Sequence, residues 1–226
     1  MAEEKKTLMR GVVVEFDFTA VDGAQLLFET AQKILAAKGV ELTIKLEAMH
    51  LAGGNYQGGL AEYFAVVKTK KLAAKAAKDL SAAFVSALNE AVPKSITQGF
   101  RKFVQTIAAK GVKIVISTRA DVETVRPAFA GLLGDDVVLF QETSSTYGSV
   151  KWDAWRRACA MNKLRNFSTI AVTGSGFGVK SALVAGMGSV AVTSPHVAYQ
   201  DFGGADEVVS ELNAAAAKTI LEILRA

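Results

Sequence analysis

The chain has 226 residues, of which half are hydrophobic and 21% are charged, so its composition excludes an intrinsically disordered protein and allows one core domain with a small insertion. No run of about 18 apolar residues occurs, and residues 1–6 lack the apolar core of a signal peptide, so we expect a cytoplasmic protein without a membrane partner. The net charge of +4 suggests nucleic acid, but Lys71, Lys75 and Lys78 follow the spacing of a solvated helix face. No aromatic residues interleave with these lysines for base stacking, so we expect no nucleic-acid partner.

The first predicted element is a strand at residues 11–15, and a long stretch without strands follows it. That stretch has the 3.6-residue periodicity of helices at residues 22–38, 45–51, 60–69, 71–88 and 96–110. Because it is too long for a single crossover helix, it predicts an all-helical subdomain at residues 22–93, inserted into a core of residues 1–21 and 94–226. Pro93 marks the boundary, since the residue before a proline disfavours helix, and the glycine-rich residues 53–59 interrupt the helical block.

Strands and helices alternate along the rest of the chain. Apolar runs typical of strands occur at residues 112–117, 137–140, 168–173 and 189–192. Helical patterns occur at residues 120–133, 152–162, 179–185 and 207–224. This alternation predicts an α/β fold in which helices cover both faces of a parallel sheet, a three-layer Rossmann-like arrangement.

Residues 12–22 read Val-Val-Val-Glu-Phe-Asp-Phe-Thr-Ala-Val-Asp. A buried strand that ends in this way places Glu15 and Asp17 at the carboxyl edge of a parallel sheet, where open α/β folds bind their ligands. The stretch resembles the first motif of the haloacid dehalogenase (HAD) superfamily, an apolar run followed by Asp-x-Asp-x-Thr. In that family the first Asp is the nucleophile and the second is the general acid/base. The resemblance therefore puts Glu15 at the nucleophile position and matches Asp17 and Thr19.

Two further stretches resemble the second and third motifs of the family. Residues 112–118 end in Ser117 and Thr118, and the resemblance implies that Ser117 hydrogen-bonds a phosphoryl group. Lys151 stands where the third-motif lysine stabilises the nucleophile and the transferring phosphoryl charge, with Trp152 where the family usually has Pro. Without the other motifs, Lys151 would be interpreted as a surface lysine before a helix.

Residues 170–187 resemble the fourth motif, a strand followed by an acidic pair, Ser-x-x-Gly-Val and a helix that ends in Ala-Gly-Met. The frame matches, but Thr173 and Gly174 replace the acidic pair that binds Mg²⁺ in the family. Taken alone, Gly174, Gly176 and Gly178 suggest a dinucleotide-binding loop, but their spacing differs from that fingerprint and no acid follows at the end of the next strand. A glycine-rich turn before a helix can still bind phosphate through backbone N–H groups.

The resemblance covers nearly the whole chain and implies a phosphatase-type, HAD-like hydrolase whose helical insertion is a cap. It implies catalytic roles for Glu15, Asp17, Ser117 and Lys151, and Mg²⁺ binding through Glu15 and the carbonyl group of Asp17. It also implies substrate contacts from the first two motifs and the cap loop, namely Phe16, Phe18, Thr19, Thr118, Gly54 and Asn55. The cap loop has a second interpretation, a plain turn between helices.

The two departures from the motifs change the expected chemistry. Without an acid at Gly174, Mg²⁺ loses a carboxylate ligand, so we expect weak or absent metal binding. Glu15 is one methylene longer than Asp, which displaces an attacking oxygen by more than about 1 Å and can lower a rate on the order of 10²-fold. Replacing both residues by Asp is expected to restore metal binding.

The expected function is that of a phosphatase-like protein that acts on or binds a small phosphorylated metabolite, or phosphate, with impaired Mg²⁺-dependent catalysis. The alternative is a non-catalytic pseudoenzyme that binds a phospho-ligand or another protein. The sequence specifies neither the ligand nor the oligomeric state.

Overall fold

The computed structural model describes residues 9–50, 56–66, 73–143 and 151–225. Six strands in these residues form one sheet in the order β3–β2–β1–β4–β5–β6. They are β1 (Met9–Glu15), β2 (Lys113–Thr118), β3 (Val137–Gln141), β4 (Leu164–Thr173), β5 (Gly188–Val192) and β6 (Glu207–Val209). All neighbouring strands are parallel, so all of them end at the same edge. The predicted α/β class with a parallel sheet is confirmed.

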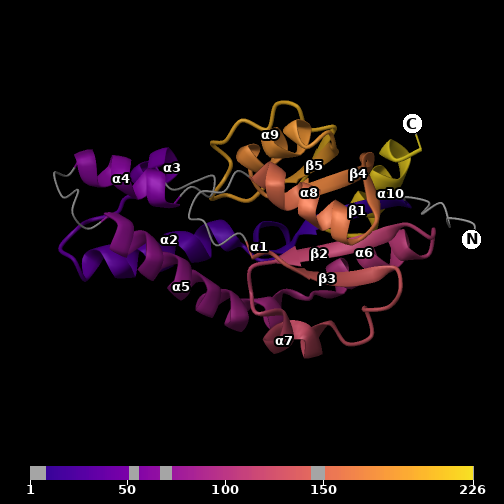
Figure 1. The fold of residues 1–226 in the computed structure, drawn as a ribbon, viewed down its shortest axis with the longest axis horizontal. Helices are drawn as coiled ribbons and strands as arrows, with labels where there is room; N and C mark the ends of the chain where they lie inside the picture. The colour runs from indigo at the N-terminus through magenta and orange to yellow at the C-terminus, as the bar shows by residue number, and fades with distance from the viewer. Residues whose placement is uncertain (1–8, 51–55, 67–72, 144–150, 226) are drawn as a thin grey trace, which may run out of the picture.

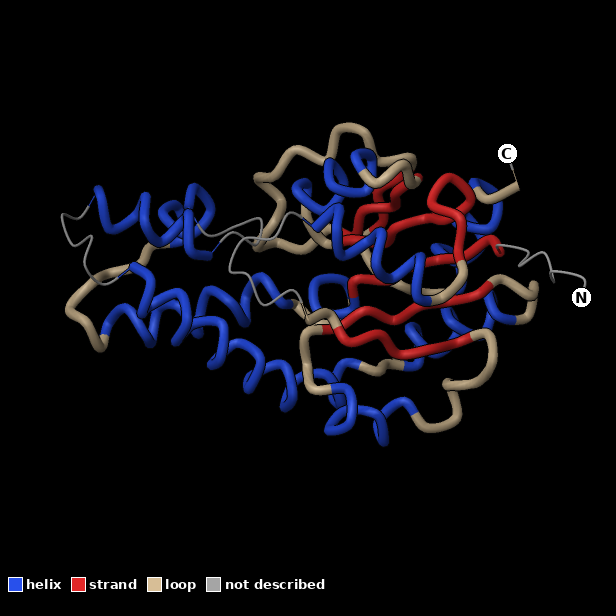
Figure 2. Tube along the Cα trace, in the orientation of Figure 1, coloured by secondary structure: helices blue, strands red, loops and turns tan. Residues whose placement is uncertain are grey.

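Alternate residues of the central strand β1 face opposite layers. Val12 and Val14 belong to the larger apolar cluster, together with residues of α6 (Gln98–Ala108), η3 (Arg126–Phe129) and α10 (Ala214–Ile223). Val13 belongs to a second cluster, with residues of α8 (Lys151–Met161) and α9 (Gly176–Val184). Helices therefore cover both faces of the sheet (Figure 2), which is why β1 is apolar on both sides.

The described chain between β1 and β2 contains helices and no strand, as its periodicity predicts. The helices are α1 (Phe16–Thr19), α2 (Gly23–Ala36), α3 (Ile44–His50), α4 (Tyr56–Val66), α5 (Ala73–Ala91), the 3₁₀ turn η2 (Val92–Ser95) and α6, which leads back to the sheet. Helices α2 to α5 lie together beside the sheet (Figure 1), and α5 contacts both α2 and α4. The function of this helical lobe as a cap, and its boundaries at residues 22 and 93, stay predictions.

Helix α5 ends at Ala91, just before Pro93, and the glycine-rich interruption predicted at residues 53–59 is described only in part. The chain continues through Pro93 as the 3₁₀ turn η2, where Pro93 occupies one of the first two positions; proline is tolerated there because those N–H groups need no partner within the helix. Gly58 and Gly59 do not interrupt the block, since they lie inside α4. Residues 53–55 of the predicted interruption lie outside the described residues.

Two predicted helices of the core also differ. The pattern at residues 120–133 forms a short helix, α7 (Val122–Val125), and then η3, which begins at Arg126 with Pro127 in its first turn. The pattern at residues 207–224 starts too early, because Glu207–Val209 pair with β5 as the edge strand β6. Helix α10 begins after Asn213, whose side-chain oxygen accepts hydrogen bonds from the N–H groups of Ala215 and Ala216. Among the described residues, no helix is both long and apolar enough to cross a membrane.

Candidate functional site

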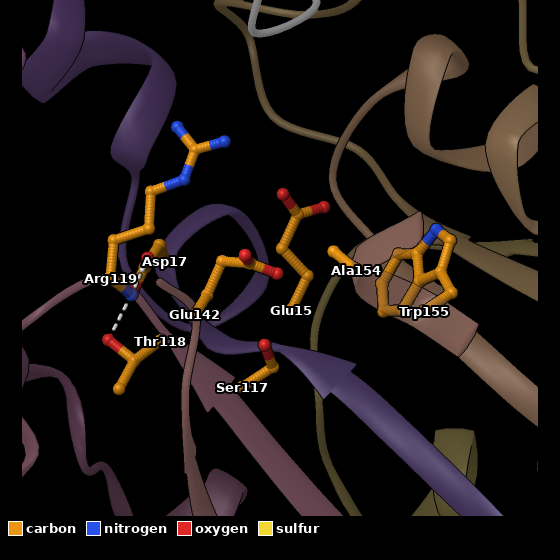
Figure 3. A pocket seen from close by; sticks show the side chains of 8 residues that line it. All are labelled: Glu15, Asp17, Ser117, Thr118, Arg119, Glu142, Ala154 and Trp155. Atoms are coloured by element: carbon orange, nitrogen blue, oxygen red, sulfur yellow. Dashed lines mark hydrogen bonds between the residues drawn. The ribbon is translucent and has the colours of Figure 1, made fainter. Parts of the chain in front are cut away.

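The carboxyl edge of the sheet holds a small cavity lined by side chains from neighbouring strands and from α8 (Figure 3). Glu15 and Ser117 are register partners across the β1–β2 pair, and Asp17 follows in the turn α1. The lining residues are Glu15, Asp17, Ser117, Thr118, Arg119, Glu142, Ala154 and Trp155. Three of the four residues predicted to be catalytic therefore meet in one place. The fourth, Lys151, is the first residue of α8, the helix that supplies Ala154 and Trp155; its side chain lies outside the described part of the structure.

Asp17 is almost completely buried and is held by two donors from the end of β2. Its Oδ1 accepts a hydrogen bond from the hydroxyl of Thr118 at 2.5 Å, and its Oδ2 accepts one from the backbone N–H of Arg119 at 2.7 Å. Burial raises the pKa of the Asp17 carboxyl from 3.8 to about 6, and the hydrogen bonds from Thr118 and Arg119 only partly oppose this rise. A carboxyl group with a pKa near neutral can both give and accept a proton, which suits a general acid/base.

Glu15 is also buried, with 6% of its surface exposed, but its carboxylate has a different partner. Its Oε2 accepts a hydrogen bond of 2.5 Å from the hydroxyl of Thr173, at the end of the neighbouring strand β4. Thr173 is one of the two residues that replace the fourth-motif acids. The substitution therefore converts a position that would repel Glu15 into a donor that holds it.

The residues predicted to contact substrate divide into three groups. The ring of Phe16 is fully buried and makes edge contacts with Phe100 and Phe129, and the ring of Phe18 packs on Phe84. The hydroxyl groups of Thr19 and Thr118 donate to the protein itself, the first to the Glu15 carbonyl oxygen at 2.7 Å and the second to Asp17. Gly54 and Asn55 lie outside the described residues. A substrate contact from Phe16 would therefore have to come from its backbone, whereas the ring of Phe18 is only partly buried.

The described residues do not fit the Mg²⁺ ion that the resemblance implies. No group of three or more His, Cys, Asp or Glu side chains among them is arranged to hold a metal ion. Glu15 has taken a hydroxyl partner, and the carbonyl oxygen of Asp17 lies against Gly23, where an added Cβ would come within 2.0 Å of it. Gly174 is packed just as closely, since a Cβ there would lie 1.7 Å from the carbonyl oxygen of Phe18. We therefore derive no step that uses the ion.

Four lining residues were not predicted from the sequence, namely Arg119, Glu142, Ala154 and Trp155. Arg119 and Glu142 directly follow the ends of β2 and β3, so the rule that ligands bind at the carboxyl edge could have found them. The side chain of Glu142 is 8% exposed and forms an ion pair with Arg157 at 2.8 Å. Trp155 is buried on the first turns of α8, and its indole N–H has no hydrogen-bond partner among the described residues. No sequence signal distinguishes it from a core tryptophan.

The comparisons with known proteins identify the fold. No protein-family model matches the sequence, and no curated protein matches it. Among solved structures, beta-phosphoglucomutase from Clostridium difficile matches with a TM-score of 0.73 and 15% identity over 96% of this chain and 98% of that chain. A HAD family hydrolase from Deinococcus radiodurans R1 with bound phosphate and sodium matches with a TM-score of 0.59 and 17% identity over 96% of each chain. CbbY from Rhodobacter sphaeroides in complex with phosphate matches with a TM-score of 0.62 and 15% identity over 91% of this chain and 95% of that chain. The chain therefore has the HAD fold, as its motifs predict.

Proposed function

We propose that this chain binds a small phosphorylated metabolite, or phosphate, in the cavity at the carboxyl edge of the sheet, and that its Mg²⁺-dependent hydrolysis is impaired or absent. The helical lobe of residues 22–93 serves as its cap. The observation that carries this proposal is the hydrogen bond between Glu15 and Thr173, because it holds one oxygen of the carboxylate that would have to attack phosphorus.

Ligand binding is supported by the polar groups that the cavity retains. Ser117 lines the cavity beside Glu15, and Asp17 lies in its wall with a pKa raised to about 6 by burial. A chain that served only as a scaffold would need neither group at this edge. CbbY and the D. radiodurans hydrolase, which share the fold, have been crystallised with phosphate, and a CbbY variant with xylulose-(1,5)bisphosphate.

Impaired turnover is supported by the state of the Glu15 carboxylate. A nucleophilic oxygen must offer a lone pair to phosphorus, and a short hydrogen bond from Thr173 both stabilises the negative charge and fixes its direction toward β4. Glu15 also carries one more methylene than the Asp of the motif, and displacement on the order of 1 Å can lower a rate about 10²-fold. Both effects reduce attack without removing the binding groups around the site.

Two measurements on the unmodified protein test the proposal. Isothermal titration calorimetry with inorganic phosphate should detect binding. Hydrolysis of p-nitrophenyl phosphate in the presence of Mg²⁺ should stay near the uncatalysed background and should not change in the Glu15→Gln variant. Strong Mg²⁺-dependent hydrolysis that Glu15→Gln abolishes would make Glu15 a working nucleophile. Absence of phosphate binding would favour the alternative, a pseudoenzyme that binds another protein.

A further inference from the structure

A phosphoryl group carries up to two negative charges, so a site that binds it needs positive charge. Among the residues that the structure describes, the carboxylates at the sheet edge are not arranged to supply that charge by holding Mg²⁺. We infer that the guanidinium group of Arg119 supplies it instead, and that the cavity binds a phosphoryl oxyanion without a divalent metal. This inference rests on the proposed function, because it names the group that recognises the ligand of the same site.

The position of Arg119 is set by its backbone and leaves the side chain beside the cavity. Arg119 directly follows Thr118, the last residue of β2, and its N–H donates to Oδ2 of Asp17 at 2.7 Å. That bond fixes the Cα of Arg119 at the cavity wall. In Figure 3 the side chains of Arg119 and Glu15 both extend away from the strand ends, on either side of Glu142. The guanidinium group therefore lies on the same side of the strand ends as the carboxylate of Glu15.

Each carboxylate of the cavity has a hydrogen-bond or ion-pair partner other than the Arg119 side chain. Glu15 accepts a hydrogen bond from Thr173, and Asp17 accepts one from Thr118. Glu142 forms its ion pair with Arg157, a residue outside the cavity lining. An oxyanion that takes hydrogen bonds from Arg119 thus leaves no buried carboxylate without a donor, which would otherwise cost on the order of 1–3 kcal/mol.

The cavity lining combines three carboxylates, Glu15, Asp17 and Glu142, which repel an anion, with the guanidinium group of Arg119, which attracts one. A guanidinium group offers a planar fork of donors that fits two phosphate oxygens at once, and it stays charged at any pH at which the protein is folded. Ser117 lines the same cavity and adds a hydroxyl donor. Thr173 stands where the fourth motif has an acid, so one source of repulsion toward an anion is absent. A single fixed charge of this kind holds a ligand without the coordination geometry that Mg²⁺ requires.

The test is calorimetric titration of the full chain with inorganic phosphate, once in EDTA and once in excess MgCl₂. We expect the dissociation constants in the two buffers to agree within about twofold. Arg119→Met, which keeps the length of the side chain and removes its charge, should weaken binding by about tenfold or more, as expected for the loss of a charge-assisted bidentate pair. The affinity of Arg119→Lys for phosphate should lie between those of the unmodified protein and Arg119→Met, because an ammonium group keeps the charge but lacks the planar fork of donors.

Arg126→Met is the matched control. Arg126 is half-exposed and forms an ion pair with Glu123, three residues earlier in the chain. It does not line the cavity. Phosphate binding should be unchanged in this variant. Circular dichroism checks that each variant is folded. If Arg119→Met does not fold, Arg119→Lys still tests the inference. A phosphate affinity of Arg119→Lys equal to that of the unmodified protein would contradict the role of the planar guanidinium donors.

The outcomes separate this inference from the proposed function. Phosphate binding that requires Mg²⁺, or that is unchanged in Arg119→Met, would overturn the inference and leave phosphate as the ligand. Absence of phosphate binding by the unmodified protein in both buffers would overturn the proposed function as well. Binding in EDTA that Arg119→Met weakens and Arg126→Met does not is the result that supports the inference.

Discussion

Replacement of Gly174 by Asp restores the acid that the fourth motif would have at this position, but the structure predicts that the variant is destabilised. A Cβ on Gly174 would lie 1.7 Å from the carbonyl oxygen of Phe18 and 2.6 Å from its carbonyl carbon. Real Cβ contacts essentially never fall below 3.0 Å, so the backbone must move by at least about 1.3 Å, the difference between the two distances. The obstacle is main chain of α1, the turn that also carries Asp17. The movement would therefore displace the site that the new acid is meant to complete.

The size of the effect follows from the rigidity of that neighbour. Overpacking in a well-packed region costs typically about 1–3 kcal/mol, and we expect the upper end because a backbone carbonyl cannot rotate away as a side chain can. For a chain of 226 residues, 1 kcal/mol corresponds to about 2–4 °C in the unfolding midpoint, so the midpoint should fall by roughly 6–12 °C. This geometry opposes the expectation from the sequence that Asp at positions 15 and 174 together restores metal binding, and that expectation stays a prediction.

Differential scanning calorimetry of three variants distinguishes the steric cause from the charge. Gly174→Ala and Gly174→Asp should lose similar stability, because the Cβ that clashes is common to both. Gly134→Asp is the control, since a Cβ at Gly134 would meet no heavy atom within 4 Å, and its midpoint should change little. A Gly174→Asp variant that unfolds at the temperature of the unmodified protein and binds Mg²⁺ in a calorimetric titration would refute this reasoning.

Two further variants test the buried carboxylates. Thr173→Val removes the hydroxyl that donates to Glu15 and should lower the unfolding free energy in urea by about 1.5–3 kcal/mol, the usual contribution of a hydrogen bond to a charged group. Thr173→Ser should retain most of the stability, and equal losses in both variants would point to packing instead. Burial raises the pKa of Asp17 from 3.8 to about 6, so between these values the folded chain holds a proton that the unfolded chain has released. Relative to Asp17→Asn, the unfolding free energy should therefore fall as the pH rises from about 4 to about 6, by on the order of 3 kcal/mol. Parallel pH profiles for the two proteins would contradict the raised pKa.

The strands were predictable because each central strand is an apolar run buried on both faces. Val12, Val13 and Val14 have no exposed surface. Such apolar runs indicate strands of a parallel sheet when helices alternate with them along the chain. The edge strand β6 was missed because it has three residues and two of them are exposed. Its assignment depends on pairing with β5, a contact that the local pattern around Glu207 does not encode.

The site was predictable to the extent that it follows from the ends of strands. Glu15 and Ser117 meet because β1 and β2 are parallel neighbours and both residues end an apolar run. The hydrogen bond between Glu15 and Thr173 joins residues 158 positions apart. No local sequence pattern predicts which side chain will donate to a buried carboxylate. The same limit applies to Phe16, whose ring could have faced either the ligand or the core until Phe100 and Phe129 were placed around it.

The departures from the motifs at positions 15 and 173 compensate each other in the structure. In a site without a divalent cation, an acid at position 173 would put two carboxylates at the ends of adjacent strands, and like charges about 4 Å apart repel by roughly 4 kcal/mol near a protein surface. The threonine at position 173 donates a hydrogen bond to Glu15 instead, from the end of β4, the strand that pairs with β1. A change at either position alone would leave a buried carboxylate repelled or without its donor. The pair is therefore best understood as one arrangement suited to a metal-free edge, with Gly174 leaving room for the turn of Phe18.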